Sequence, residues 1–249
     1  MCSLLLSRDE VPAALSLLGP HRCALHHGLA VLRIRTDQRL PAAFLSEFTV
    51  TRLLDRFYLC VRDVRRAPVL YRSFFEWIAY RYDQLIERSR NVGNITFLLR
   101  QSIRCSRVEI SHILDYGCGT GLSMQALRAL RWPEGLPRLT GVDTCPQMRR
   151  RARMRQLRTV SPEQLHVRRV PCFSAIVASY VLHLPTALSG VEDAWRLLIP
   201  GGVFIGNCHK GLGFAETRAL LRSLGAETRR LQDRRHSLAH GHLLVAWKP

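Results

Sequence analysis

The stretch Ile113-Leu-Asp-Tyr-Gly-Cys-Gly-Thr-Gly121 decides the fold of this chain. It begins in a short apolar run, His112–Asp115, and is followed by Leu122–Trp132, whose apolar residues recur at helical spacing. Glycine has no side chain, so the G-x-G-x-G pattern allows a sharp turn and a close approach of a ligand to the backbone. A strand, a glycine turn and a helix in this order predict the first βα unit of a parallel sheet.

The same alternation of short apolar runs and helical stretches continues to the end of the chain. The predicted strands are His112–Asp115, Arg138–Asp143, His166–Val170, Ser174–Ser179, Gly202–Asn207 and Leu243–Trp247. The predicted helices are Leu122–Trp132, Gln147–Leu157, Val191–Leu198 and Ala215–Leu224. Strands that alternate with helices predict an α/β fold with a Rossmann-like, mostly parallel sheet and helices on both faces.

The region before this domain has a different composition. Residues 1–66 are rich in Leu, Ala and Arg, and their prolines predict short helices. Val69–Arg88 has the apolar spacing of a longer helix, whose aromatic residues would form a core or a lid. We therefore expect residues 1–88 to be a helical N-terminal extension or cap, and residues 89–249 to be the cofactor-binding domain.

Two acidic residues indicate which cofactor the turn binds. Asp143 ends the next predicted strand, where an acid can accept hydrogen bonds from both ribose hydroxyls. Asp115 stands two residues before the first glycine, and a carboxylate there would repel a pyrophosphate but suits a cationic amino group. S-adenosylmethionine carries an ammonium group, a sulfonium and a ribose, and no phosphate. The alternative is an ordinary βα turn with a chance acid nearby.

The glycine stretch resembles motif I of the class I S-adenosylmethionine-dependent methyltransferases, which commonly reads V/I-L-D-x-G-C-G-T-G. The resemblance extends over about residues 80–249. Further matches to motifs of that family lie at Leu139–Met148, Phe173–Pro185 and Leu197–Ile205. The resemblance implies a seven-stranded, mostly parallel sheet in which Leu243–Pro249 forms the closing antiparallel strand. It also implies methyltransferase activity with S-adenosylmethionine as the cofactor.

The family motifs also imply a set of binding residues. By this resemblance Asp143 would hold the ribose, and Thr144 and Met148 would lie beside the adenine. The complete predicted cofactor site is Asp115, Gly117, Cys118, Gly119, Thr120, Gly121, Asp143, Thr144, Met148 and Ser179. Ser174 stands where many members have Asp, and no acid for the adenine amino group occurs between Gln164 and Phe173. A binding-only member of the family is therefore a second interpretation.

Candidates for catalysis follow the fourth strand. Methyl transfer is an in-line displacement with a neutral leaving group, so the protein mainly supplies positioning and a dry site. A general base is needed only if the acceptor must lose a proton, and His183 is the best candidate. Tyr180 is a candidate to close over the methyl group. The alternatives are a core or capping histidine and a packing tyrosine, and His209 and Lys210 either contact the acceptor or form a solvated loop.

The charge of the chain bears on the methyl acceptor. The net charge is +18, and of the 37 basic residues only Lys210 and Lys248 are lysines. Such an excess favours anionic partners, including nucleic acid. The arginines at positions 149, 150, 151, 153, 155 and 158 form either a solvated helix face or a surface that follows phosphates. Without aromatic residues between them we favour a small-molecule acceptor, with an RNA methyltransferase or a ribosome-assembly factor as the alternative.

Several other classes of protein are not indicated. No apolar run reaches the roughly 18 to 20 residues that cross a bilayer. The eight cysteines are scattered, and His236, His240 and His242 have no suitably spaced acidic or cysteine partner, so we expect no metal site. Scattered cysteines favour the cytoplasm, with an organelle matrix as the alternative because the N-terminus is amphipathic and carries arginine. Nothing in the sequence indicates an oligomeric state.

Overall fold

The computed structural model describes residues 1–54, 56–130, 132, 135–184, 187–231 and 242–249. The chain divides into two compact units, Met1–Ile86 and Glu87–Pro249. This division lies two residues before the boundary expected after residue 88. Each unit has its own hydrophobic core.

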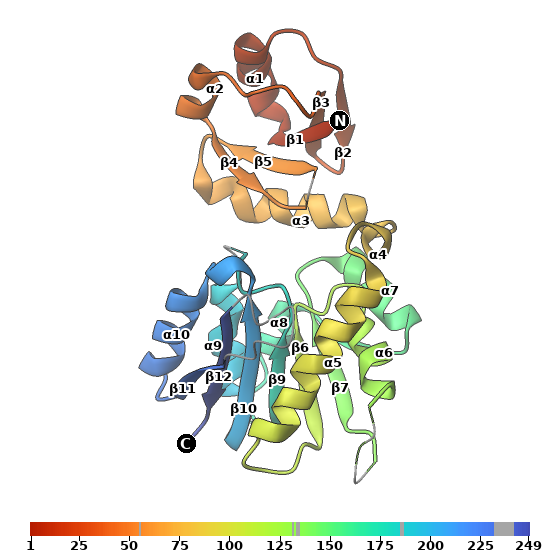
Figure 1. Ribbon diagram of the computed structural model, residues 1–249, viewed down its shortest axis with the longest axis vertical. Coiled ribbons are helices and arrows are strands. Elements are labelled where there is room, and N and C mark those ends of the chain that lie inside the picture. Colours follow the sequence, from red (N-terminus) through yellow and green to blue (C-terminus); the bar gives the residue numbers. More distant parts are fainter. Residues whose placement is uncertain (55, 131, 133–134, 185–186, 232–241) are drawn as a thin grey trace. The chain divides into compact units, whose positions relative to one another are not determined.

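The first unit is built on a five-stranded sheet (Figure 1). Its strands are β1 (Cys2–Ser7), β2 (Cys23–His26), β3 (Leu29–Ile34), β4 (Thr49–Arg52) and β5 (Phe57–Val61), in the order β2-β3-β1-β5-β4. Only the pair β1–β5 is parallel. Its helices are α1 (Val11–Leu18), α2 (Ala42–Glu47), α3 (Ala67–Ile78) and α4 (Tyr82–Leu85), with 3-10 turns at Arg8–Glu10 and Val64–Arg66.

The expectation that residues 1–88 are helical was therefore wrong, because this unit also contains a sheet. The buried runs Leu4–Leu6 and Leu29–Leu32 are apolar at every position, so they lack the alternation that marks a half-buried strand. A short apolar run cannot be told from a buried helix by its period. The predicted helix Val69–Arg88 is two helices, α3 and α4, and Phe74 of α3 is buried in the core of this unit against Phe57.

The second unit contains a seven-stranded sheet in the order β11-β12-β10-β9-β6-β7-β8. The strands are β6 (His112–Tyr116), β7 (Arg138–Val142), β8 (Arg158–Val160), β9 (Phe173–Ala178), β10 (Leu198–Cys208), β11 (Glu227–Leu231) and β12 (His242–Trp247). Strands β6 to β10 run parallel, and β12 is antiparallel to both β10 and β11. The prediction of a Rossmann-like, mostly parallel sheet is confirmed.

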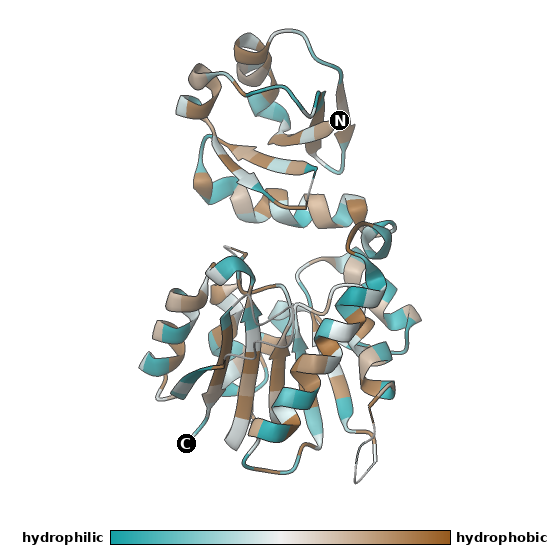
Figure 2. Ribbon diagram, in the orientation of Figure 1, coloured by the Kyte–Doolittle hydropathy of each residue, from teal (hydrophilic) through white to brown (hydrophobic). Residues whose placement is uncertain are grey.

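Helices cover both faces of this sheet. They are α5 (Arg88–Cys105), α6 (Leu122–Arg128), α7 (Pro146–Met154), α8 (Pro162–His166), α9 (Leu188–Arg196) and α10 (Phe214–Ser223), and a 3-10 turn spans His209–Gly211. Figure 1 shows α5 in front of the sheet and α8 and α9 behind it. The strands β9, β10 and β12 between these layers are mostly hydrophobic (Figure 2). The fully buried Phe173 and Phe204 belong to the core between the sheet and α9.

The structure corrects two predictions in this unit and adds one strand that was not predicted. The third strand is β8, and the predicted strand His166–Val170 is not formed. Residues 162–166 form α8, so His166 is the last residue of a helix. Strand β8 has only three residues, and Ser161 directly after it caps α8, accepting a hydrogen bond from the backbone of Gln164. Strand β11 was not predicted because its sequence, ETRRL, is mostly charged. Helix α7 ends at Met154, so Arg155 and Arg158 lie beyond it. None of the described helices is both long and apolar enough to cross a membrane.

Candidate active site

The register of the parallel strands lines up the predicted cofactor residues at one edge of the sheet. Val160, Val142, Tyr116, Ala178 and Gly206 form one row across five strands. The residues that directly follow these five are, in the same order, Ser161, Asp143, Gly117, Ser179 and Asn207. Because the carboxyl ends of parallel strands meet at the same edge, these residues stand side by side where α/β folds bind ligands.

The glycine turn connects β6 to α6 and is held tightly. The N–H groups of Gly117 and Cys118 both donate to the carbonyl of Val142, at 2.9 and 3.0 Å. Gly121 has a φ of +81°, and a Cβ there would lie 2.8 Å from the Cα of Ala152 in α7. Only glycine combines this left-handed backbone with such a close approach, which explains the glycine before the helix.

Asp143, the first residue after β7, reaches across to the glycine turn. Its Oδ2 accepts a hydrogen bond from the backbone N–H of Gly119 at 2.9 Å, and its Oδ1 accepts one from Cys145 at 2.8 Å. Burial raises the pKa of this carboxyl, while the two N–H donors and Arg149 oppose that rise. A carboxylate offers about four acceptor positions, so the two backbone bonds leave capacity for a ligand.

Asp115 is the second acid of the site and is almost fully buried, at 4% exposure. It lies within β6 beside Gly141 of β7 and Val177 of β9. Burial, assisted by the charge of Asp143 and opposed by the hydroxyl of Ser123, raises the pKa of Asp115 to about 7. A buried carboxyl without a cationic partner resists ionisation, and a bound cation would favour its charged form.

The other predicted cofactor residues differ in exposure. Cys118, Thr120 and Met148 are buried, Ser179 is half-buried, and Thr144 is exposed. The thiol of Cys145 caps α7 by accepting a hydrogen bond from the N–H of Met148 at 3.5 Å. The region around Asp143 thus brings most of the predicted set to one edge.

Comparisons with known proteins agree with this geometry. Residues 114–206 match the sequence profile of a family described as a methyltransferase domain. This match, together with the fold, supports a class I S-adenosylmethionine-dependent methyltransferase domain in the second unit, with S-adenosylmethionine as its cofactor. A comparison with curated proteins finds no match.

Solved structures share the fold of this methyltransferase domain. DesVI from Streptomyces venezuelae is 17% identical with a TM-score of 0.53, and the match covers 69% of this chain and 97% of that protein. Magnesium protoporphyrin IX methyltransferase from Synechocystis PCC 6803, solved with bound S-adenosylmethionine, is 15% identical with a TM-score of 0.50. That match covers 73% of this chain and 96% of that protein. At such identities the likeness shows the fold alone.

The residue that follows Ser179 at this end of the sheet is a tyrosine with an unusual backbone conformation. Tyr180 has a φ of +53°, a backbone conformation that is costly for a bulky residue. Its N–H donates to Asn207 Oδ1 at 2.7 Å, and its hydroxyl accepts from Asn94 Nδ2 at 2.9 Å. Both asparagines are buried, at 2% and 3% exposure. Two fixed amides therefore hold Tyr180 in its strained conformation next to Ser179.

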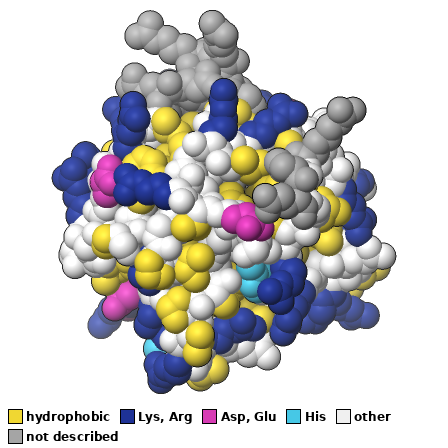
Figure 3. Space-filling model, turned by 90° about the horizontal axis from the view of Figure 1, so that it is seen from below, with side chains coloured by type: hydrophobic (Ala, Val, Ile, Leu, Met, Phe, Trp, Pro, Cys, Tyr) yellow, Lys and Arg dark blue, Asp and Glu magenta, His cyan; other side chains and the backbone are white. Residues whose placement is uncertain are grey.

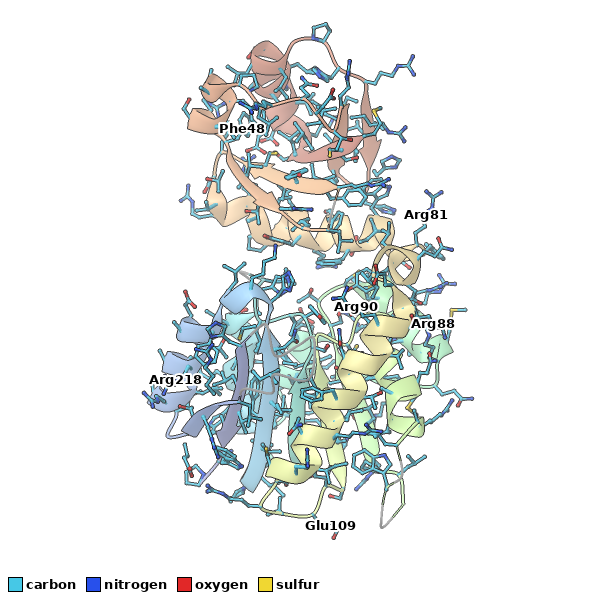
Figure 4. The ribbon with its side chains drawn as sticks, in the orientation of Figure 1. Phe48, Arg81, Arg88, Arg90, Glu109 and Arg218 are labelled. Carbon is cyan, nitrogen blue, oxygen red and sulfur yellow. The ribbon has the colours of Figure 1, made fainter. Side chains whose placement is uncertain are left out.

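These two asparagines were not predicted from the sequence. Asn94 lies on α5, before the matched motifs, and Asn207 lies on β10, just after the matched stretch Leu197–Ile205. The only available signal was a polar residue at the end of an apolar strand, which applies to Asn207 alone. Burial raises the pKa of Tyr180, and the charge of Arg90 in the first turn of α5 (Figure 4) opposes this.

His183 stands close to the same edge. Its ring lies 5.6 Å from that of His209, which in turn lies 5.8 Å from the ring of Tyr180. Burial, assisted by the charge of His209, lowers the pKa of His183 to about 4. Its buried Nδ1 has no hydrogen-bond partner among the described residues. His183 is therefore a neutral imidazole at pH 7 with an uncommitted nitrogen.

Other singled-out residues lie outside this arrangement. Ser174 sits near the opposite end of β9, where its hydroxyl bonds to the backbone of Ser111 and His112. Lys210 is exposed, whereas His242 contacts Phe214, with ring centroids 5.0 Å apart. His236 and His240 lie outside the described residues. Within the described part of the chain, no three acidic, histidine or cysteine side chains are grouped as metal ligands.

Proposed function

We propose that this methyltransferase binds S-adenosylmethionine at the Asp115–Asp143 edge and methylates a small molecule. The observation that carries the proposal is the pair of backbone hydrogen bonds that fixes the carboxylate of Asp143 against the glycine turn. A carboxylate held in this way is ready to accept hydrogen bonds from the ribose hydroxyls. The cofactor would supply an electrophilic methyl group on its sulfonium.

Each acid has its own role in this proposal. Asp143 binds the ribose, and Asp115 pairs with the ammonium group. Binding of that cation would lower the pKa of Asp115 from about 7, so the ionised carboxyl and the ligand would stabilise one another. Thr144 and Met148 flank the adenine, and Gly117, Cys118, Gly119, Thr120, Gly121 and Ser179 complete the predicted site.

His183 and Tyr180 are the proposed catalytic residues. A neutral imidazole with an unpartnered Nδ1 can accept a proton from the hydroxyl or amine of an acceptor. Tyr180, held by two buried amides, would limit the position of the acceptor beside the methyl group. Positioning and exclusion of water would then account for most of the rate enhancement.

The groups that touch this pair are mostly neutral, which supports a small acceptor. Asn94, Asn207 and His209 add neutral polar groups to the site, and the charge of Arg90 also acts on Tyr180. All eight cysteines are free. Reduced cysteines support a cytoplasmic location as part of the proposal.

An RNA acceptor is the second candidate, because the net charge is +18. Figure 3 shows many more basic than acidic side chains on the face that it presents. Such a surface would hold nucleic acid with an affinity that falls steeply with salt.

The first experiment measures binding of S-adenosylmethionine by calorimetry to the full-length protein and to D143A. We expect binding by the wild-type protein and a loss of about 1 to 3 kcal/mol in D143A, because charged hydrogen bonds to the ribose disappear. Labelled S-adenosylmethionine is then incubated with the protein and cell extract, which is separated into small molecules and RNA. Label in the small-molecule fraction supports the proposal, whereas label in RNA supports the second candidate. Absence of cofactor binding at millimolar concentrations contradicts both.

A further inference from the structure

Helix α7 lies along the two loops that form the proposed cofactor site. Arg149, Ala152 and Arg155 follow one another at three-residue spacing, so they share one side of the helix and its end. The middle member, Ala152, packs against Gly121, where an added Cβ would come within 2.8 Å of its Cα. The two arginines on either side therefore face the same turn region.

Arg155 bonds to the glycine turn itself. Its Nη1 donates to the backbone carbonyl of Thr120 at 2.6 Å. Thr120 lies between Gly119 and Gly121, and it is 2% exposed. Glycine-rich backbone has many accessible conformations, so a charged hydrogen bond to the residue between the two glycines restricts the turn.

Arg149 makes the corresponding bond to the second loop. Its Nη1 donates to the backbone carbonyl of Asp143 at 2.6 Å. Its charge also lies close enough to oppose the effect of burial on the pKa of the Asp143 carboxyl. The groups that face this carboxyl from other elements are Asp115 and Tyr116 on β6, Cys118 in the glycine turn and the N–H of Gly119.

We propose that Arg149 and Arg155 are positioning residues, which fix the Asp143 loop and the glycine turn to α7 so that both loops are set before the cofactor binds. This inference rests on the proposed binding of S-adenosylmethionine at these loops. It assigns to two members of the arginine run a role inside the site in place of a role in binding phosphates.

Neighbouring arginines have different surroundings. Arg150 is exposed, and no hydrogen bond or ion pair joins it to the described residues. Arg149 and Arg155 are half-buried. Arg150 is thus a matched control, since it has the same charge on the same helix without a contact to either loop.

The experiment measures binding of S-adenosylmethionine between pH 5 and 9 to the wild-type protein and to R149Q, R155Q, R155K and R150Q. We expect R155Q to lose about tenfold in affinity at every pH, the effect of losing one charged hydrogen bond, and R155K to recover part of it. R149Q should lose affinity and shift the acidic limit of binding to higher pH, because the pKa of Asp143 rises without the nearby charge. R150Q should stay within about twofold of the wild type, as is usual for exposed positions.

The outcomes separate this inference from the proposal beneath it. If the wild type binds and R149Q and R155Q bind as R150Q does, the positioning role is wrong while the cofactor site stands. If the wild type itself does not bind, the cofactor site is wrong and the positioning role falls with it. Thermal melts of every variant identify loss of folding. If R155Q unfolds, the folded R155K variant tests the role of Arg155. Weaker binding by R155K than by R150Q supports the positioning role, and equal binding overturns it.

Discussion

The two units of this chain differ in how many polar side chains they bury and in how those side chains are hydrogen-bonded. Among the described residues, the first unit buries one polar side chain of this kind, Glu10. Its Oε1 accepts from the N–H of Arg62, and its Oε2 accepts from the N–H and hydroxyl of Ser7. The second unit buries nine: Asn94, Ser102, Asp115, Thr120, Ser123, Thr140, Ser174, Asn207 and Thr217.

The difference separates groups that maintain the fold from groups that serve a site. Glu10 bonds only to neighbouring backbone and to one hydroxyl, so its charge is used entirely within the fold. In the second unit, Asp115 lies beside Asp143, and His183 has an unpartnered nitrogen. Buried polar groups without full satisfaction cost stability, and they persist where a ligand completes them. The comparison therefore places function in the second unit.

The largest effect is expected from substitutions of glycine. Gly28 in the first unit and Gly121 in the second have φ values of +77° and +81°, but only Gly121 is closely packed. G28A should destabilise the protein by about 1 kcal/mol through the left-handed backbone. G121A should cost about 3 kcal/mol, because the methyl group also displaces α7. Chemical denaturation of both variants measures the difference.

Equal losses in the two glycine variants would contradict the view that only the second unit has a closely packed turn. G121A should also abolish detectable binding of S-adenosylmethionine, while G28A should bind as the wild type does. Calorimetry on the folded variants tests that second part.

A smaller effect is expected in the first unit from E10A. This substitution removes three hydrogen bonds to a buried carboxylate, and we expect a loss of about 2 kcal/mol in the free energy of unfolding. The matched control is E47A, which removes a surface ion pair with Arg62 and should cost under about 1 kcal/mol. Neither variant should alter the affinity for S-adenosylmethionine. A change in that affinity with E10A would show that Glu10 does more than maintain the fold.

Sequence reasoning predicted the second unit well because its signals are local. Gly117 to Gly121 occupy a turn whose conformation requires glycine, and Asp143 follows the next strand. Both features can be recognised within a short window of residues. The parallel register then brings them together without further information.

Sequence reasoning failed where pairing or packing over long distances decides the structure. Strands β1 and β3 of the first unit pair across a helix and a hairpin, and their uniform apolar character hid their period. Asn94 donates a hydrogen bond to Tyr180, although the two residues lie 86 positions apart in the chain. Arg149 and Arg155 were treated as members of one charge run, although their contacts with two carbonyls distinguish them from Arg150. None of these partners can be read from neighbouring residues.

The last effect on stability is expected from D115N, and its sign is opposite to that of the other variants. The pKa of Asp115 is raised from 3.8 to about 7 in the folded protein. Between these two pH values the folded state therefore binds more protons than the unfolded state, so stability falls as the pH rises through this window. Asparagine does not titrate, so D115N should be more stable than the wild type above pH 7, and denaturation at pH 5 and pH 8 measures this. The control is D37N, which replaces an exposed acid of the first unit.

Binding should respond to D115N in the opposite direction. Ionised Asp115 is needed to pair with the ammonium group, so D115N should lose about tenfold in affinity for S-adenosylmethionine at pH 8. The wild-type affinity should rise as the pH increases through about 7, because the cation no longer has to displace a proton, and this rise should be absent in D115N. A variant that is both more stable and weaker in binding would show that the carboxyl of Asp115 is retained for the ligand at the expense of the fold. Unchanged binding together with higher stability would instead show that Asp115 destabilises the fold without contributing to binding. The buried polar groups of the second unit would then no longer indicate a ligand site.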